Sequence, residues 1–135
     1  MRLNQVTVGT VDIDRAERFY RALGLVLIVK DDHYLRFECP DGESTFSVER
    51  FSTKPANRPP SDEQVTVYFE TDDVDACCAR LTGLGIEVVQ PPEDMPWLWR
   101  EARLDDPDGH RLCIYHAGSD RRFPPWRLPQ AAHDV

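Results

Sequence analysis

Acidic, basic, thiol and phenol side chains alternate with apolar residues along residues 100–116, REARLDDPDGHRLCIYH. Glu101 and Arg103 precede a turn in this stretch, and Cys113 and Tyr115 follow it. Alternation with a period of two is typical of strands that have one apolar and one polar face. On such a polar face a carboxylate could act as a general base, a thiol as a nucleophile and an arginine as an anion-binding group.

The turn at Asp106-Pro107-Asp108-Gly109 predicts that this stretch is a pair of strands. Pro107 fixes φ near the value needed at the second position of a turn, and Gly109 accepts the positive φ that follows. The apolar residues of the two strands are Ala102, Leu104, Leu112 and Ile114. We expect a helix to cover this apolar face, which leaves the polar face open for function.

The composition is ordinary for a globular chain of one domain, with 135 residues, 41% hydrophobic and 30% charged. A formal net charge of −8 argues against nucleic acid or an anionic membrane as a partner, because both require a basic face. The longest apolar run, LGLVLIV at 23–29, has the length of a strand, and the N-terminus lacks a signal-peptide pattern. We therefore expect no membrane partner and a cytoplasmic location.

The four cysteines are Cys39, Cys77, Cys78 and Cys113, and none of them forms a Cys-x-x-Cys pair. This spacing argues against a structural zinc site and suits a reducing compartment. We interpret all of them except Cys113 as packing residues.

The first half of the chain predicts a strand, a helix and three further strands. Asp12 is the expected N-cap of the helix, and Gly24 is the residue that ends it. The predicted strands are 3–8, 25–29, 33–38 and 44–49.

The same order restarts after a proline-rich linker, residues 51–62. A strand is predicted at 65–70 and another, IEVVQ, at 86–90, on either side of a second helix. Asp73 and Gly85, its expected ends, lie 61 positions after their counterparts in the first helix, and four apolar helix positions keep the same offset. Such a constant offset indicates an internal duplication.

The predicted fold class is α+β, with two tandem β-α-β-β-β units in one structural domain. The boundaries are 1–50 for the first unit, 51–62 for the linker, 63–118 for the second unit and 119–135 for a proline-rich tail.

The last strands of the two units can be aligned in two ways. Matching their polar faces pairs Cys113 with Ser47 or Thr45, whereas counting from the turn glycines pairs it with Phe46. We prefer the match by faces, because a slip of one residue would bury the polar set.

The helix starts VDIDRAERFYRALGL and DDVDACCARLTGLGIEV and the strand pair REARLDDPDGHRLCIY closely resemble the vicinal oxygen chelate superfamily. That superfamily includes glyoxalase I, bleomycin-resistance proteins and extradiol dioxygenases, and the resemblance covers residues 1 to about 116. It implies the glyoxalase/bleomycin-resistance/dioxygenase fold, in which the mixed sheets curl into a cup with the helices outside and the ligand inside. It also implies a homodimer.

In the metal-using members of that superfamily, His, Gln or Glu ligands come from the first and last strands of each unit. The matching positions here are Gln5, Thr66, Ser47 with the nearby Glu49, and Cys113. Catalysis of that kind needs about three protein ligands. Among these positions only Gln5 is a plausible ligand, Glu49 and Cys113 are doubtful, and Thr66 and Ser47 are unsuitable. The resemblance therefore implies no cofactor for this chain. A divalent metal is disfavoured, and if one bound, its ligands would be Gln5, Glu49 and Cys113.

The polar faces of the predicted strands together define a candidate ligand-binding surface. Its residues are Gln5, Tyr34, Arg36, Ser47, Glu49, Thr66, Tyr68, Trp99, Glu101, Arg103, Cys113 and Tyr115. Aromatic rings offer stacking faces, and Arg36 and Arg103 offer paired donors to a carboxylate or phosphate. The leading hypothesis is a metal-independent protein of this superfamily that binds a small aromatic or amphipathic molecule.

Two alternatives remain open. In a glyoxalase-, isomerase- or dioxygenase-type enzyme, Glu49 or Glu101 would remove a proton α to a carbonyl and an arginine would stabilise the enolate. Cys113 could serve as a nucleophile or soft metal ligand, but no histidine is placed to activate it. In a partner module, the tail residues 123–126 would bind a neighbouring subunit.

Overall fold

The computed structural model describes residues 1–51 and 64–129. The first unit contains β1 (Gln5–Thr10), α1 (Ile13–Leu23), β2 (Val26–Lys30), β3 (Tyr34–Glu38) and β4 (Thr45–Arg50). The second unit contains β5 (Thr66–Glu70), α2 (Val74–Gly83), β6 (Gln90–Asp94), β7 (Arg100–Asp105) and β8 (Arg111–His116). A short 3-10 helix, η2 (Gly118–Asp120), follows β8.

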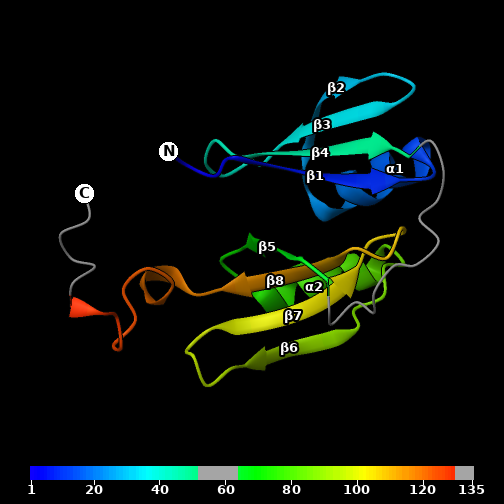
Figure 1. Cartoon of the computed structure of the whole chain (residues 1–135). Coiled ribbons are helices and arrows are strands. Elements are labelled where there is room, and N and C mark those ends of the chain that lie inside the picture. The colour runs from blue at the N-terminus through cyan, green and yellow to red at the C-terminus, as the bar shows by residue number, and fades with distance from the viewer. Residues whose placement is uncertain (52–63, 130–135) are drawn as a thin grey trace.

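The two units have the same strand order, β1-β4-β3-β2 and β5-β8-β7-β6, as Figure 1 shows. In each sheet the first and last strands of the unit are parallel and the other pairs are antiparallel. The predicted fold class, two tandem β-α-β-β-β units with mixed sheets, is confirmed. The sheets are not joined into a closed barrel, because β1 and β5 are the outer strands of separate sheets.

Both helices begin at the predicted aspartates. Asp12 accepts a hydrogen bond from Arg15 N, and Asp73 accepts one from Ala76 N. Each cap satisfies an N–H group that has no partner within its helix. Gly24 ends α1 with φ 113°.

The strand after α2 begins later than predicted. The prediction placed it at 86–90, but the structure places β6 at Gln90–Asp94. The backbone N–H of Ile86 donates to Leu81 O at the end of the helix, so this residue does not pair with a strand. Ile86 and Val88 pack against the core instead. Their apolar character reflects packing, and the local pattern did not separate packing from strand pairing.

One hydrophobic core joins the two units. The apolar faces of both sheets meet the buried faces of α1 and α2, and Figure 1 shows both helices behind the sheets. Tyr20 of α1 and Phe69 of β5 both contact Phe46 of β4, with ring centroids 4.6 and 5.6 Å from it. Ala102, Leu104, Leu112 and Ile114, the predicted apolar face of 100–116, are all buried in this core.

The turn between β7 and β8 fastens the second unit to the first. Tyr20 Oη donates to Asp106 Oδ2 at 2.6 Å, and both side chains are buried. Asp108 accepts from Thr10 Oγ1 at 2.6 Å and from Val11 N at 3.0 Å. The Asp-Pro-Asp-Gly stretch therefore forms a turn and also holds the junction between β1 and α1.

The strand registers confirm the match by polar faces. Thr7 pairs with Ser47 across β1 and β4, and Tyr68, which lies 61 positions after Thr7, pairs with Cys113 across β5 and β8. Ser47 and Cys113 are therefore equivalent positions of the two units.

Of the predicted linker, 51–62, only Phe51 lies within the described residues, and the end of the tail, 130–135, lies outside them. Within the described part of the chain, no helix is long and apolar enough to span a membrane.

Candidate functional site

An aromatic cluster lies on the polar face of the second sheet. The rings of Trp99 and Tyr115 stack, with centroids 4.8 Å apart and planes 27° apart. Tyr68 stands edge-on to both rings, at 6.0 and 5.5 Å. Stacked and edge-on aromatic pairs hold one another in place and leave ring surface for a further planar group. Tyr68 is 50% exposed, whereas Tyr115 is buried, so the cluster reaches solvent mainly through Tyr68.

Two arginines lie beside this cluster, around Cys113. Arg103 pairs directly with Cys113 across β7 and β8, and Arg111 precedes Cys113 by two residues on the same face of β8. In each arginine the Nε atom is buried and has no hydrogen-bond partner among the described residues. A buried donor without a partner is costly. Both arginines are half-buried as whole residues, and guanidinium groups bind anions through paired hydrogen bonds.

Arg111 was missing from the predicted set. The alternation of RLCIYH already places it on the polar face with Cys113 and Tyr115, so the signal was present in the sequence.

Cys113 is 2% exposed at the centre of this face. Burial, together with the negative charge of Glu101, raises the pKa of its thiol to about 12. The thiol therefore keeps its proton at neutral pH, which makes it a poor nucleophile and a poor metal ligand. Glu101 itself accepts a hydrogen bond from Trp97 Nε1 at 2.7 Å.

The polar face of the first sheet holds a smaller network. Tyr34 Oη and Ser47 Oγ are 2.6 Å apart, and Arg36 Nε donates to Tyr34 Oη at 3.0 Å. At the other end of this face, Thr45 Oγ1 donates to Gln5 Oε1 at 2.7 Å. These groups thus bond to one another, whereas Glu49 on the same face is exposed.

The structure does not bring the alternative metal ligands together. Because Gln5 pairs with Thr45 in the parallel strands β1 and β4, Glu49 lies four positions further along, about 13 Å away. Cys113 belongs to the other sheet. Within the described residues, no group of three or more His, Cys, Asp or Glu side chains is arranged to hold a metal ion. Gln5, Glu49 and Cys113 therefore do not fit a common metal.

A groove of about 1180 Å³ runs between the facing edges of the two units, along β1 and β5. Gln5 lines it on one side, and Tyr68 and Tyr115 line it on the other. It therefore joins one end of the first polar face to the aromatic cluster. Tyr34, Arg36, Ser47, Glu49, Arg103 and Cys113 do not line it.

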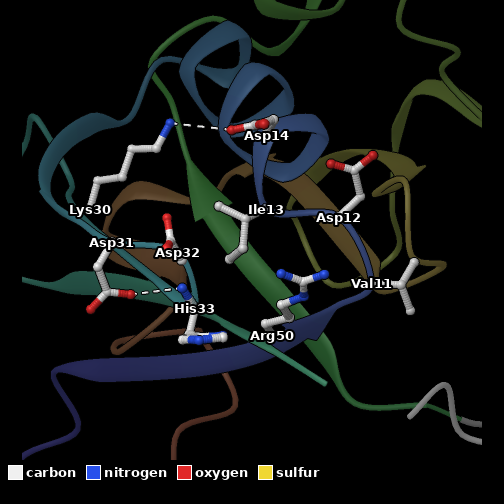
Figure 2. A pocket seen from close by; sticks show the side chains of 9 residues that line it. All are labelled: Val11, Asp12, Ile13, Asp14, Lys30, Asp31, Asp32, His33 and Arg50. Atoms are coloured by element: carbon white, nitrogen blue, oxygen red, sulfur yellow. Dashed lines mark hydrogen bonds and ion pairs between the residues drawn. The ribbon is translucent and has the colours of Figure 1, made fainter. Parts of the chain in front are cut away.

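A smaller cavity of about 390 Å³ lies at the N-terminus of α1 (Figure 2). Three of its four acidic side chains serve local structure: Asp12 caps α1, Asp14 pairs with Lys30, and Asp31 accepts a hydrogen bond from the backbone of His33. No residue of the predicted ligand-binding set lines this cavity.

The sequence of the chain matches a known family. The family model of the Glyoxalase/Bleomycin resistance protein/Dioxygenase superfamily matches residues 2–114. The chain belongs to this superfamily. The prediction of a vicinal oxygen chelate protein is therefore confirmed.

Two curated proteins resemble the chain in sequence. It is 33% identical to anthracycline biosynthesis protein DnrV from Streptomyces peucetius and 31% identical to anthracycline biosynthesis protein DauV from Streptomyces sp. (strain C5). Each alignment covers 82% of this chain and 45% of the relative. The chain thus spans less than half the length of these curated relatives.

Solved structures of the superfamily share the fold. Lactoylglutathione lyase from Agrobacterium tumefaciens has a TM-score of 0.69 and 22% identity, with 94% of this chain and 97% of that one covered. TioX from Micromonospora sp. ML1 has a TM-score of 0.68 and 23% identity, with 87% and 99% covered. At this identity the likeness shows the fold alone.

Proposed function

We propose that the chain binds a small planar aromatic molecule that carries an acidic group, on the polar face of the second sheet. The observation that carries the proposal is the pair of half-buried arginines beside the cluster of Tyr68, Trp99 and Tyr115. They are Arg103 and Arg111, whose Nε atoms have no partner among the described residues. The rings would stack on the ligand, and the guanidinium groups would bind its acid.

The names of the curated relatives support an aromatic ligand. They are called anthracycline biosynthesis proteins, and anthracyclines contain a planar anthraquinone. A binding role needs no metal, and the donor set of Gln5, Glu49 and Cys113 does not converge on one.

A binding titration tests this proposal. The probe is anthraquinone-2-carboxylate, followed by calorimetry, with the neutral 2-(hydroxymethyl)anthraquinone as its matched comparison. We expect the acid to bind more tightly than the alcohol, because only the acid forms charge-assisted hydrogen bonds. Arg103→Ala and Arg111→Ala should each weaken binding of the acid by roughly 10- to 100-fold.

Two matched variants control for charge alone. Arg36→Ala removes an arginine from the other polar face, and Arg18→Ala removes one from the exposed side of α1. Both should bind the acid as the wild-type chain does. Equal affinity of wild-type and Arg103→Ala protein for the acid would refute the role assigned to Arg103.

We also propose that the chain forms a homodimer. The support is a set of large apolar side chains in the tail that stay largely exposed in the described part of the single chain: Phe123, Trp126 and Leu128, which are 56%, 57% and 70% exposed. Light scattering of the full chain over a dilution series measures its mass, and a monomer at every concentration would exclude the dimer.

A cytoplasmic location is the last part of this proposal. All four cysteines are free thiols in the structure, as is usual in a reducing compartment. Fractionation of the producing cell, followed by detection of the chain, tests the location.

A further inference from the structure

The segment after β8 is hydrogen-bonded to β5 where it begins, at Ala117 and Gly118, and further on it exposes aromatic side chains to solvent. Glu70 Oε2 accepts from Ala117 N at 2.8 Å and from Gly118 N at 2.9 Å, so the start of the segment is bound to the end of β5. Further on, Phe123 N donates to Ser119 O, and the guanidinium groups of Arg122 and Arg127 lie over the Phe123 ring.

This segment is basic in an acidic protein. Residues 118–129, GSDRRFPPWRLP, contain three arginines and one aspartate, whereas the whole chain has a formal net charge of −8. Arg122 forms no salt bridge with any described residue. The segment therefore combines exposed aromatic rings with positive charge.

The groove between the units has the complementary character. Its floor includes the apolar side chains of Val6, Phe46, Val67 and Phe69. Its rim includes the exposed carboxylates of Asp41 and Asp72, for which the described residues provide no salt bridge. The charged lining is acidic on balance, because four carboxylates outnumber Arg80 and Arg121. An acidic lining with apolar side chains suits a basic aromatic segment.

The pseudo-symmetry of the fold explains why the groove is open. At one end of the molecule, Asp106 and Asp108 of the β7–β8 turn bind the junction between β1 and α1. The equivalent turn of the first unit, at Pro40-Asp41-Gly42, lines the groove opposite residues 71–73, the junction between β5 and α2. Among the described residues no hydrogen bond joins that turn to that junction.

The described part of a chain's own tail, 119–129, does not fill this groove. Gly118 and Arg121 line its rim, but Phe123 and Trp126 are not among the lining residues. Figure 1 shows the segment after η2 running away from both sheets. A tail that begins at the rim of its own groove and points outward is placed to reach a second molecule.

We propose that Phe123 and Trp126 of each protomer dock in the groove of a second copy of the chain, with Arg122 facing Asp41 and Asp72. The two docked tails make a reciprocal exchange, as two-fold symmetry requires of a dimer. This inference rests on the proposed homodimer and names the surfaces that form it.

The first experiment measures the dimer dissociation constant by light scattering and sedimentation of the full chain. Phe123→Ala combined with Trp126→Ala should raise this constant roughly 100-fold, because buried aromatic residues dominate interface energies. Leu84→Ala is the matched control, since Leu84 is 59% exposed and does not line the groove. It should leave the constant unchanged.

Charge reversal provides the second experiment. Asp72→Arg and Arg122→Asp should each weaken the dimer by 10-fold or more, and the double variant should restore most of the affinity. Circular dichroism of each variant establishes that it is folded.

The outcomes separate the two proposals. A wild-type chain that is monomeric at every concentration overturns both the dimer and the docking. A dimer that withstands loss of both aromatic side chains, or charge-reversed variants that do not rescue each other, overturns the docking and leaves the dimer standing.

Discussion

At the scale of single residues, Tyr20 and Asp106 form a buried polar pair between the units. Burial, with the negative charge of Asp106, raises the pKa of the Tyr20 phenol far above its usual value. The hydroxyl therefore keeps its proton and donates to Asp106 Oδ2. Asp106 Oδ1 accepts from the backbone N–H groups of Asp108 and His110, so one carboxylate joins α1 to the β7–β8 turn.

Tyr20→Phe should lower the free energy of unfolding by about 1–3 kcal/mol, because it removes a donor from a buried carboxylate. Chemical denaturation measures this loss. Tyr68→Phe serves as the control, since Tyr68 is half-exposed, and it should change stability by less than about 0.5 kcal/mol. Equal effects of the two substitutions would contradict the role of the Tyr20 hydroxyl.

At the scale of elements, Glu70 connects the end of β5 to the chain that leaves β8. Burial raises the pKa of Glu70, but the N–H groups of Ala117 and Gly118 outweigh it and hold the pKa below the usual 4.5. A lowered folded pKa means that the ionised form is stabilised by folding. This contribution is present above pH 4.5 and is lost as the pH falls through the lower folded value.

We therefore predict that the hydrogen bonds from Ala117 and Gly118 to Glu70, at the start of the tail, weaken in acid. The amide resonances of Ala117 and Gly118, followed by NMR from pH 6 downward, should shift together with a midpoint below 4.5. Glu70→Gln keeps an oxygen acceptor but does not titrate, so it should abolish this shift. A midpoint above 4.5 in the wild-type chain would show that the two hydrogen bonds do not stabilise the carboxylate.

At the scale of the whole molecule, duplication has produced two similar units with different polar faces. The equivalent positions Ser47 and Cys113 illustrate this difference. Ser47 lies in a satisfied hydrogen-bonded network with Tyr34, whereas Cys113 lies between two arginines whose Nε atoms have no partner among the described residues. The second unit therefore carries the stronger candidate site, and the first contributes mainly its edge of the groove.

The arrangement of the strands also predicts the metal content. Because Gln5 and Glu49 lie about 13 Å apart along β1 and β4, too far to share a metal, protein purified without a chelator should contain much less than one equivalent of metal. Elemental analysis measures this content, and calorimetric titration with Zn, Ni, Mn and Fe(II) follows. A stoichiometric metal that is lost in Cys113→Ser protein would contradict this prediction.

Local rules made much of the fold predictable from the sequence. An aspartate before an apolar period of 3.6 marks a helix start, and strict alternation assigns each residue of 100–116 to a face, because both effects act over a few residues. Local rules also explain the one misplaced strand, since the apolar side chains of Ile86 and Val88 satisfy packing without pairing.

The sequence by itself determined the two units, their helix caps, and the grouping of Glu101, Arg103, Cys113 and Tyr115 on one polar face. Only the tertiary structure decided which polar groups of this face have no partner among the described residues, as is the case for the Nε atoms of Arg103 and Arg111. It also decided that the Asp106 turn holds α1, and that a groove separates β1 from β5. These features depend on residues far apart in the chain, such as Tyr20 and Asp106, whose contact is set by how the two units pack against each other.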